Sequence, residues 1–308
     1  MTMDSRDGSN ARFSGLSGSK LSGPSPSAAG PTRRGILLGA GALAGSVALG
    51  GRRASAQAKL GAPNLIKPGT LIMSINPTLP PLQFVNDKGE LQGMRVELGN
   101  EIAKVLGLTP EYVRIEFAAM VPGLAAKRWD MINTGIFWTE ERSKLMYMVP
   151  YERAAVSFLV SRGNPLGVAK WQDLAGKAVG VELGGIEERR TREVDAMLKK
   201  EGLAGLDVRT FNNFAEAFQA LRAGQVQAAT SIDATAMYWQ GRGDFTRAIA
   251  GLFPQTATFA FADKTLALAV VDALNGLKKS GFYDALFDRY GVLKIEGDSF
   301  KIDGPGPA

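Results

Sequence analysis

Leu71-Ile72-Met73-Ser74-Ile75 is a short apolar run, and the prediction of the fold begins there. A run of this length is typical of a buried strand. The next pattern, over residues 94–106, has helical spacing, because its apolar residues fall on one face of a helix. A buried strand followed by an amphipathic helix predicts an α/β unit.

The same alternation continues through two series and ends with a pair of helices. This order predicts an α/β fold with a mainly parallel sheet in each of two lobes. Two similar lobes imply a cleft between them, where small-molecule sites are common. The Gly- and Pro-rich residues 297–308 are predicted to be a tail. The expected elements are strands at residues 71–75, 112–117, 131–136, 154–160, 178–181, 208–211, 226–232 and 256–261, and helices at 94–106, 121–128, 139–146, 186–200, 214–223, 234–240, 266–279 and 282–290.

The composition limits the chemistry that the chain can perform. The 308 residues are 45% hydrophobic and 21% charged, which indicates a globular protein of about two domains. The chain has no Cys and no His, so disulfides, Cys/His metal sites, thiolate nucleophiles and imidazole catalysis are excluded. We expect no cofactor and no bound metal.

The first 56 residues differ from the rest. They carry seven basic and two acidic residues, and so +5 of the chain's net charge of +6. The remainder is nearly neutral, which argues against a nucleic-acid partner. Residues 1–32 are rich in Ser, Gly and Pro and are predicted to be disordered.

An export signal is predicted within this leader. Arg33-Arg34 precede the apolar residues 35–51, and Arg52-Arg53 and Ala54-Ser55-Ala56 follow. An anchor helix is the alternative, but basic residues beyond the apolar run resist ordinary translocation. The order of features resembles a twin-arginine signal that is cleaved near Ala56 or Ala58. The mature protein would then lie in the periplasm.

Several short motifs occur in a fixed order along the remaining chain. They are the stretches from Leu71 to Phe84 and from Asp87 to Leu98, Val121-Pro122-Gly123-Leu124, Trp129-Asp130-Met131-Ile132, Thr139-Glu140-Glu141-Arg142, Val149-Pro150-Tyr151, Gly176-Lys177-Ala178-Val179-Gly180-Val181, Ser280-Gly281-Phe282-Tyr283 and Arg289-Tyr290-Gly291. This ordered set resembles the polar amino-acid family of periplasmic solute-binding proteins, the receptors of ABC importers. The resemblance covers residues 71–291.

The resemblance implies a type II periplasmic binding protein, in which two α/β lobes are joined by two crossing strands. The crossings are expected near Val160 and Phe259. Lobe one would then comprise residues 59–160 and 259–308, and lobe two residues 161–258. The resemblance also implies an amino-acid-like ligand in the cleft and an inner-membrane permease as partner. We expect a monomer.

Two charged residues are the first candidates for holding a zwitterion. The resemblance assigns the ligand carboxylate to Arg142, whose planar guanidinium binds a carboxylate through two parallel hydrogen bonds. It assigns the ligand ammonium to Asp233, although Asp also favours the start of a helix. An isolated Arg142 would otherwise be a solvated side chain.

A turn between the second lobe's first strand and helix supplies the next candidates. Gly184, Gly185 and Ile186 could present backbone amides to an anion, although a plain turn is the alternative. The family usually has hydroxyl residues here. Glu182 and Glu187 flank this turn and would face a cationic group or solvent.

Other departures from the family leave the ligand open. They include an Asn where an acid is frequent and Arg95 as a possible extra cation. Neutral, hydrophobic and acidic amino acids and conjugates all remain possible ligands. Core packing is the alternative role for the apolar candidates. The further expected site residues are Asn76, Leu79, Met120, Gly135 and Phe137.

Two other functions remain open. A cyclohexadienyl-dehydratase-like enzyme on the same fold would need a cleft acid with a raised pKa, for which Glu182 or Glu187 is the candidate. A sensor would present its closed state to a membrane receptor, and the sequence does not separate sensing from transport. We expect a binding protein and not an enzyme.

Overall fold

The computed structural model describes residues 63–307, all of which belong to one compact unit. The expected leader, with its twin-arginine signal and cleavage point, lies outside the described residues. Within residues 63–307, no helix combines the length and the hydropathy that crossing a bilayer requires.

The first lobe is built from the elements β1 (Thr70–Ile75), β2 (Thr78–Leu79), β3 (Gln83–Val85), β4 (Leu91–Gln92), α1 (Met94–Val105), β5 (Thr109–Arg114), η2 (Phe117–Ala119), α2 (Met120–Ala125), β6 (Met131–Phe137), α3 (Glu140–Ser143), α7 (Lys264–Lys279), α8 (Phe282–Tyr290) and β12 (Leu293–Lys294). Every residue of β1 is buried, as its apolar run predicts. β1 pairs in parallel with both β5 and β6. The predicted strand–helix–strand unit is confirmed in this lobe.

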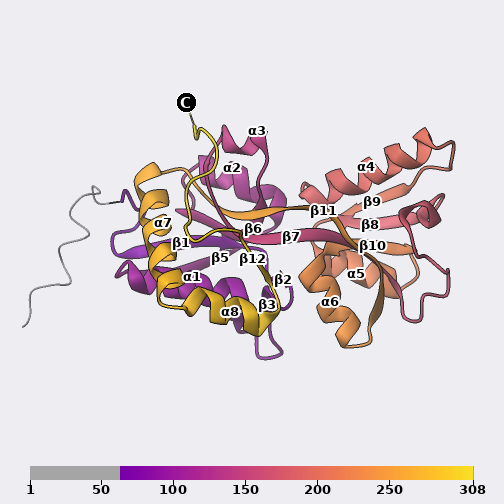
Figure 1. Cartoon of the computed structure of the whole chain (residues 1–308), viewed down its shortest axis with the longest axis horizontal. Coiled ribbons are helices and arrows are strands. Elements are labelled where there is room, and N and C mark those ends of the chain that lie inside the picture. Colours follow the sequence, from indigo (N-terminus) through magenta and orange to yellow (C-terminus); the bar gives the residue numbers. More distant parts are fainter. Residues whose placement is uncertain (1–62, 308) are drawn as a thin grey trace, which may run out of the picture. The chain divides into compact units, whose positions relative to one another are not determined.

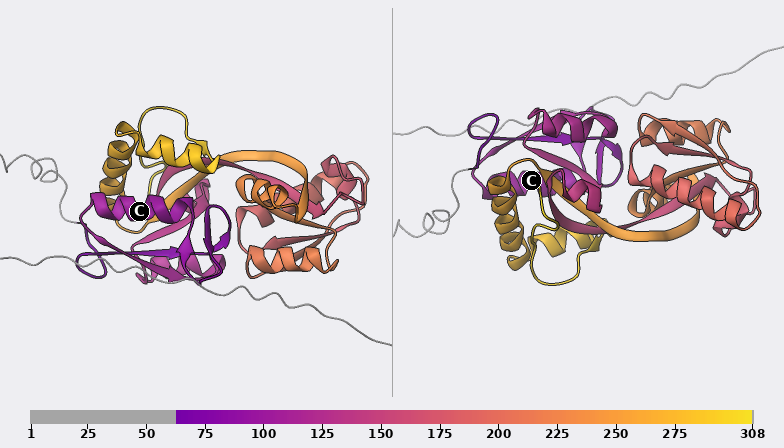
Figure 2. Two further views of the ribbon diagram at one scale, coloured as in Figure 1. Left: turned by 90° about the horizontal axis from the view of Figure 1, so that it is seen from below. Right: turned by 90° about the horizontal axis from the view of Figure 1, so that it is seen from above.

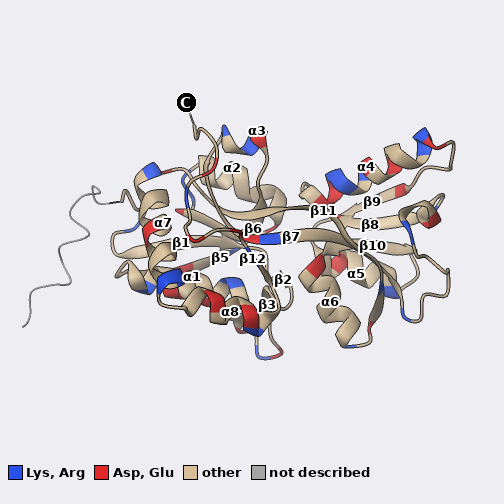
Figure 3. Ribbon diagram, viewed as in Figure 1, with Lys and Arg blue, Asp and Glu red and all other residues tan. Residues whose placement is uncertain are grey.

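The second lobe repeats the scheme with η3 (Trp171–Leu174), β8 (Ala178–Glu182), α4 (Ile186–Lys200), β9 (Asp207–Phe211), α5 (Phe214–Arg222), β10 (Ala228–Ile232) and α6 (Asp233–Gly241). β8 lies between β9 and β10 and is parallel to both. The helix expected at residues 186–200 has those bounds in the structure. This helix carries residues of both charge signs along its length, as Figure 3 shows for α4.

Two long strands join the lobes. β7 (Tyr147–Ser161) and β11 (Phe245–Phe261) are antiparallel partners along most of their lengths, with several register shifts, and Figures 1 and 2 show them running together between the two sets of helices. Through β7 and β11, the strands of both lobes form one nine-stranded sheet. Its strand order is β5-β1-β6-β11-β7-β10-β8-β9, and β12 pairs with β7. The short strands β2, β3 and β4 form a separate sheet.

The pairing partners indicate where the lobes divide. β10 pairs with β7 from Val156 to Val160, whereas β6 pairs with β11 from Ala257 to Phe261. We therefore propose lobe boundaries near residues 154 and 256, a few residues before the expected crossings at Val160 and Phe259. Each expected strand, at residues 154–160 and 256–261, is one end of a strand that is more than twice as long.

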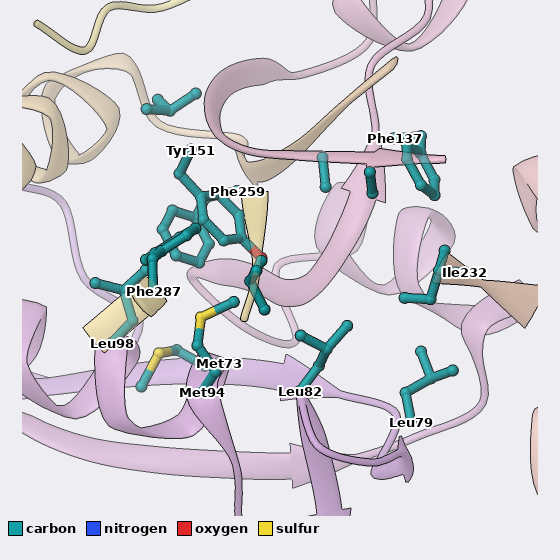
Figure 4. Packing of buried hydrophobic residues seen from close by; sticks show 14 of the residues in the cluster. Met73, Leu79, Leu82, Met94, Leu98, Phe137, Tyr151, Ile232, Phe259 and Phe287 are labelled. Carbon is teal, nitrogen blue, oxygen red and sulfur yellow. The ribbon is translucent and has the colours of Figure 1, made fainter. Parts of the chain in front are cut away.

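A hydrophobic cluster reaches across both lobes. Figure 4 shows Phe137, Leu79 and Ile232 at one side of this cluster, away from Leu98 and Phe287. Leu79 and Phe137 come from the first lobe and Ile232 from the second, so apolar side chains of both lobes pack together where the lobes meet.

Candidate functional site

Polar side chains of both lobes meet where parallel strands end. Asn76 follows β1, and its Nδ2 donates a hydrogen bond to Oε1 of Glu182, the last residue of β8, over 2.5 Å. Arg142 of α3 donates from Nη2 to the carbonyl oxygen of Gly184 over 3.3 Å. The carboxyl ends of parallel strands are the usual place for ligand sites in α/β sheets. We call this region, formed by residues 76, 137–142 and 182–187, the lobe junction.

Arg142 is held by the first lobe. Thr139 caps α3 by accepting a hydrogen bond from the backbone amide of Arg142 over 3.1 Å. The guanidinium donates from Nη1 to the carbonyl oxygen of Phe137 over 3.0 Å, and it lies 5.5 Å from the ring centre of Phe117. Among the described residues, no carboxylate forms an ion pair with Arg142. Its charge therefore meets only neutral acceptors.

Two carboxylates from the second lobe face this region. Glu182 and Glu187 are only 2% and 5% exposed. A methyl group placed on Gly185 would lie 2.6 Å from Oε2 of Glu187 and 3.7 Å from Oε2 of Glu182, so both acids border the same glycine. The expectation left open whether they face solvent, and the structure buries both.

Burial gives these acids unusual protonation behaviour. Burial raises the pKa of Glu182 well above its ordinary value, and the negative charge of Glu187 adds to the rise. Burial also raises the pKa of Glu187, while the positive charge of Arg142 opposes that rise. Buried carboxylates are stable only when they are paired or protonated.

The stability of the ligand-free protein should therefore depend on the charge of Glu182. A carboxyl whose pKa is raised in the folded state contributes stability at low pH, and this contribution is lost as the pH rises through the folded-state pKa. We expect Glu182→Gln to raise the melting temperature at about pH 8 and to change it little at about pH 5. A gain of 1 kcal/mol would appear as about 2–4 °C.

The exposed Glu201 provides a matched control for that substitution. Glu201→Gln removes one negative charge from the same lobe without releasing a buried group, so its effect should be small at either pH. Melting curves of the three proteins over this pH range make the comparison. An equal effect of both substitutions at every pH would contradict the assignment of a destabilising charge to Glu182.

Arg95 does not supply the extra cation that was considered for the ligand. It is fully buried, and its Nε and Nη2 donate to both carboxylate oxygens of Glu152. Its Nη1 donates to Oε1 of Gln83 and to the carbonyl oxygen of Thr134. Despite burial, the charge of Glu152 keeps the pKa of Arg95 above its ordinary value. Every nitrogen of this guanidinium already has a partner.

Gly135 lies directly against that guanidinium. A Cβ atom at Gly135 would come within 2.1 Å of Cζ of Arg95, so only glycine fits there. Glycine is therefore required at this position for packing against Arg95. The expected role of Gly135 in lining the site stays a prediction.

Asp233 lies in a different environment from the one expected. Its Oδ2 forms an ion pair with Nη2 of Arg247 over 2.8 Å, and its Oδ1 accepts hydrogen bonds from Ser157 and from the amide of Gly251. All these partners belong to the second lobe and its end of the crossing strands. Asp233 is the first residue of α6, whose N-cap is Ile232. Its carboxylate is thus already neutralised without a ligand.

The glycine turn is also partly occupied by the chain itself. The amide of Gly184 donates to Oε2 of Glu188 over 2.8 Å, so this amide is not free for an anion. Gly185 is the N-cap of α4, and Ile186 is buried in the cluster that spans the lobes. The sequence predicted a helix start here, but it did not reveal that Glu188, the third residue of α4, accepts a hydrogen bond from the turn.

The remaining apolar candidates divide into two groups. Leu79 and Phe137 are buried beside the junction in the cluster that spans the lobes. Met120 is fully buried in another cluster with Ile72 and Trp129, within the first lobe. Core packing, which was the alternative role for the apolar candidates, therefore describes Met120.

Three further contacts between the lobes were not predicted. Glu141 pairs with Arg189 over 3.7 Å, and Glu116 accepts a hydrogen bond from Asn213 over 3.2 Å. The rings of Phe84 and Tyr238 lie 6.5 Å apart. No periodicity reveals such pairs, because their partners are far apart in the sequence and meet only through the sheet topology.

Comparison with known proteins places this arrangement in context. The family model of bacterial extracellular solute-binding proteins, family 3, matches residues 71–292. The L-cystine-binding protein TcyJ of Escherichia coli (strain K12) is 30% identical over 227 residues, which cover 72% of this chain and 82% of that protein.

Solved structures agree with the sequence comparison. An ancestral arginine-binding protein bound to arginine has a TM-score of 0.64 and 32% identity, covering 72% of this chain and 98% of that one. The ancestral amino acid-binding protein AncCDT-1, a precursor of cyclohexadienyl dehydratase, has a TM-score of 0.63 and 26% identity, covering 72% and 95%. The predicted two-lobed α/β fold is confirmed.

Proposed function

Because this chain belongs to the bacterial extracellular solute-binding proteins of family 3, we propose that it captures an amino acid at the lobe junction and delivers it to the permease of an ABC importer. The observation that supports this proposal is the hydrogen bond from Arg142 of one lobe to the carbonyl oxygen of Gly184, which lies between two buried acids of the other lobe, Glu182 and Glu187. Opposite charges on two lobes suit a zwitterion.

In this proposal the ligand's α-carboxylate replaces the carbonyl oxygen of Gly184 at Arg142. A charged, bidentate acceptor is a stronger partner for a guanidinium than a single carbonyl oxygen. The ligand's nitrogen groups then donate to Glu182 and Glu187. Asp233 is less suited to this role, because Arg247 already neutralises it.

The same contacts indicate a ligand class. The family position expected to hold an acid for basic amino acids is Asn76, and Glu182 reaches that position from the other lobe. Two buried acids favour an amino acid with a second cationic group or further N–H donors. Arginine and cystine both have this chemistry, and two of the similar proteins are an L-cystine-binding and an arginine-binding protein.

Ligand binding would favour the closed state, in which the two lobes are in contact. A ligand shifts a conformational equilibrium only by its difference in affinity for the two states, and contacts to both lobes provide that difference. We propose that the mature protein acts as a monomer in the periplasm after cleavage of the leader near Ala56 or Ala58. The permease would bind the ligand-bound state.

A thermal-shift panel on the exported protein tests the ligand class. We expect L-arginine or L-cystine to raise the melting temperature, and L-glutamate and L-leucine to have little effect. Saturation at about 100 times Kd stabilises the folded state by about 2.7 kcal/mol, because the ligand binds the folded form alone. Stabilisation by L-glutamate or L-leucine alone would contradict the assignment of Glu182 and Glu187.

A dehydratase remains the second candidate, and one observation favours it. Glu182 is a buried acid with a raised pKa, which is the property that a general acid needs. Incubation of the protein with a hydroxycyclohexadienyl carboxylic acid, followed by mass spectrometry, distinguishes the two functions. Loss of water and carbon dioxide from that acid to give an aromatic product, abolished by Glu182→Gln, would establish catalysis.

A further inference from the structure

The C-terminal residues 297–307, which we call the strap, follow the first lobe closely instead of forming the expected tail. Phe300 is 3% exposed and packs edge-on against Tyr283, with the ring centres 5.1 Å apart. Asn275 of α7 donates to the carbonyl oxygen of Phe300 and accepts from its amide. The first half of the strap is thus fixed to the helices of the first lobe.

The second half of the strap reaches α3. The amide of Asp303 donates to the carbonyl oxygen of Met148 over 2.8 Å, and its own carbonyl accepts from Nε1 of Trp138 over 3.3 Å. The amide of Gly306 donates to the carbonyl oxygen of Ser143 over 2.9 Å. The strap therefore binds residues on both sides of α3, and Figure 1 shows the C-terminal end beside that helix.

The helix that the strap contacts needs outside support. α3 has only four residues, and a helix this short is not stable by itself. Its third residue is Arg142 and its last is Ser143. Any rotation of α3 would move the guanidinium relative to the carbonyl oxygens of Phe137 and Gly184.

We infer that the strap positions Arg142 by fixing α3, so that ligand affinity depends on residues that do not contact the ligand. This inference rests on the proposed carboxylate-binding role of Arg142. The strap packs directly on α3 at Gly304, because a Cβ atom there would lie 2.4 Å from the Cβ of the buried Ser143. Gly304→Ala should displace the strap, α3 or both.

Gly297 provides a matched control within the strap. Both glycines have positive φ, +97° at Gly304 and +90° at Gly297, so alanine strains the backbone at either position. A Cβ atom at Gly297 would meet nothing within 4 Å. The two alanine variants differ mainly in whether they disturb α3. A chain that ends at Ile302 removes the contacts with Trp138 and Ser143 altogether.

Hydrogen exchange measures the position of α3 without any ligand. The amides of Leu145 and Met146 both donate to the carbonyl oxygen of Arg142. We expect them to exchange about tenfold faster in Gly304→Ala and in the shortened chain than in Gly297→Ala, because local opening no longer breaks the strap contacts. Equal exchange in Gly304→Ala and Gly297→Ala would overturn the inference.

A second experiment tests whether the strap positions Arg142 for the ligand carboxylate or only stabilises α3 in general. L-arginine and L-argininamide differ only at the group that Arg142 is proposed to bind, and calorimetry gives the ratio of their affinities. We expect Gly304→Ala to lower this ratio about tenfold and Gly297→Ala to keep it. If Gly304→Ala speeds hydrogen exchange at Leu145 and Met146 but leaves the affinity ratio unchanged, the strap does not position Arg142. If L-arginine does not bind the unaltered protein, the proposed ligand fails, and exchange still decides whether the strap fixes α3.

Discussion

Arg142→Ala is expected to weaken the binding of L-arginine by about 2–5 kcal/mol, because the ligand carboxylate would enter the lobe junction without its charged partner. Each 1.4 kcal/mol corresponds to a tenfold change in Kd. The fold should survive, since within residues 63–307 the guanidinium makes two hydrogen bonds to carbonyl oxygens and no ion pair. Calorimetric titration of the exported protein gives the change directly, and a melting curve shows that the variant is folded.

Two comparison variants sharpen this prediction. Arg189→Ala removes an exposed guanidinium that pairs with Glu141 between the same lobes, and exposed pairs contribute about 0–1 kcal/mol. Arg142→Lys keeps the charge but loses the planar fork, so it should have an intermediate affinity. If Arg142→Ala bound L-arginine as tightly as Arg189→Ala does, the carboxylate would have to be held elsewhere.

Glu152→Gln is expected to destabilise the protein by about 3–5 kcal/mol, the largest stability effect that we predict. Arg95 and Glu152 are 0% and 1% exposed and form a bidentate ion pair. Replacing the carboxylate leaves the guanidinium buried with neutral partners alone, and its pKa is too high for it to lose the charge. Urea unfolding followed by circular dichroism measures the loss.

The neighbouring Arg153 offers a control for this prediction. Arg153 pairs with Glu296, and the two side chains are 44% and 83% exposed. Glu296→Gln should cost no more than about 1 kcal/mol, because water replaces the lost partner. The double variant Arg95→Met/Glu152→Leu should recover part of the loss, since no buried charge remains. Equal losses from Glu152→Gln and Glu296→Gln would show that the buried pair is not critical.

The sequence predicts the local elements of this fold well and their continuation poorly. A continuous apolar run identifies β1, and the spacing of apolar residues identifies α1, because burial of one helix face imposes a helical period. Neither pattern reveals that β7 and β11 continue through both lobes. A strand that exchanges one set of partners for another keeps its alternation, so the expected strands at residues 154–160 and 256–261 cover only part of β7 and β11. The strap is missed for another reason: its contacts are mostly backbone hydrogen bonds, which any sequence can make.

The candidate site, like the fold, could be predicted only in part from the sequence. Arg142 is identified by a motif, and the structure places it at the junction of the lobes. The neutralisation of Asp233 by Arg247 and the burial of Glu182 depend on residues that the sheet brings together from distant positions. Motif spacing carries no such information. The ligand's nitrogen partners were therefore assigned to Asp233 from the sequence, and we now propose Glu182 and Glu187.

The most direct test is a crystal structure of the exported protein with L-arginine, or with the strongest ligand from the panel. The account predicts that the ligand carboxylate lies within hydrogen-bonding distance of both Nη atoms of Arg142 and that a ligand nitrogen contacts Glu182 or Glu187. A ligand whose carboxylate faces the second lobe, with Arg142 still bound to the carbonyl oxygen of Gly184, would contradict it.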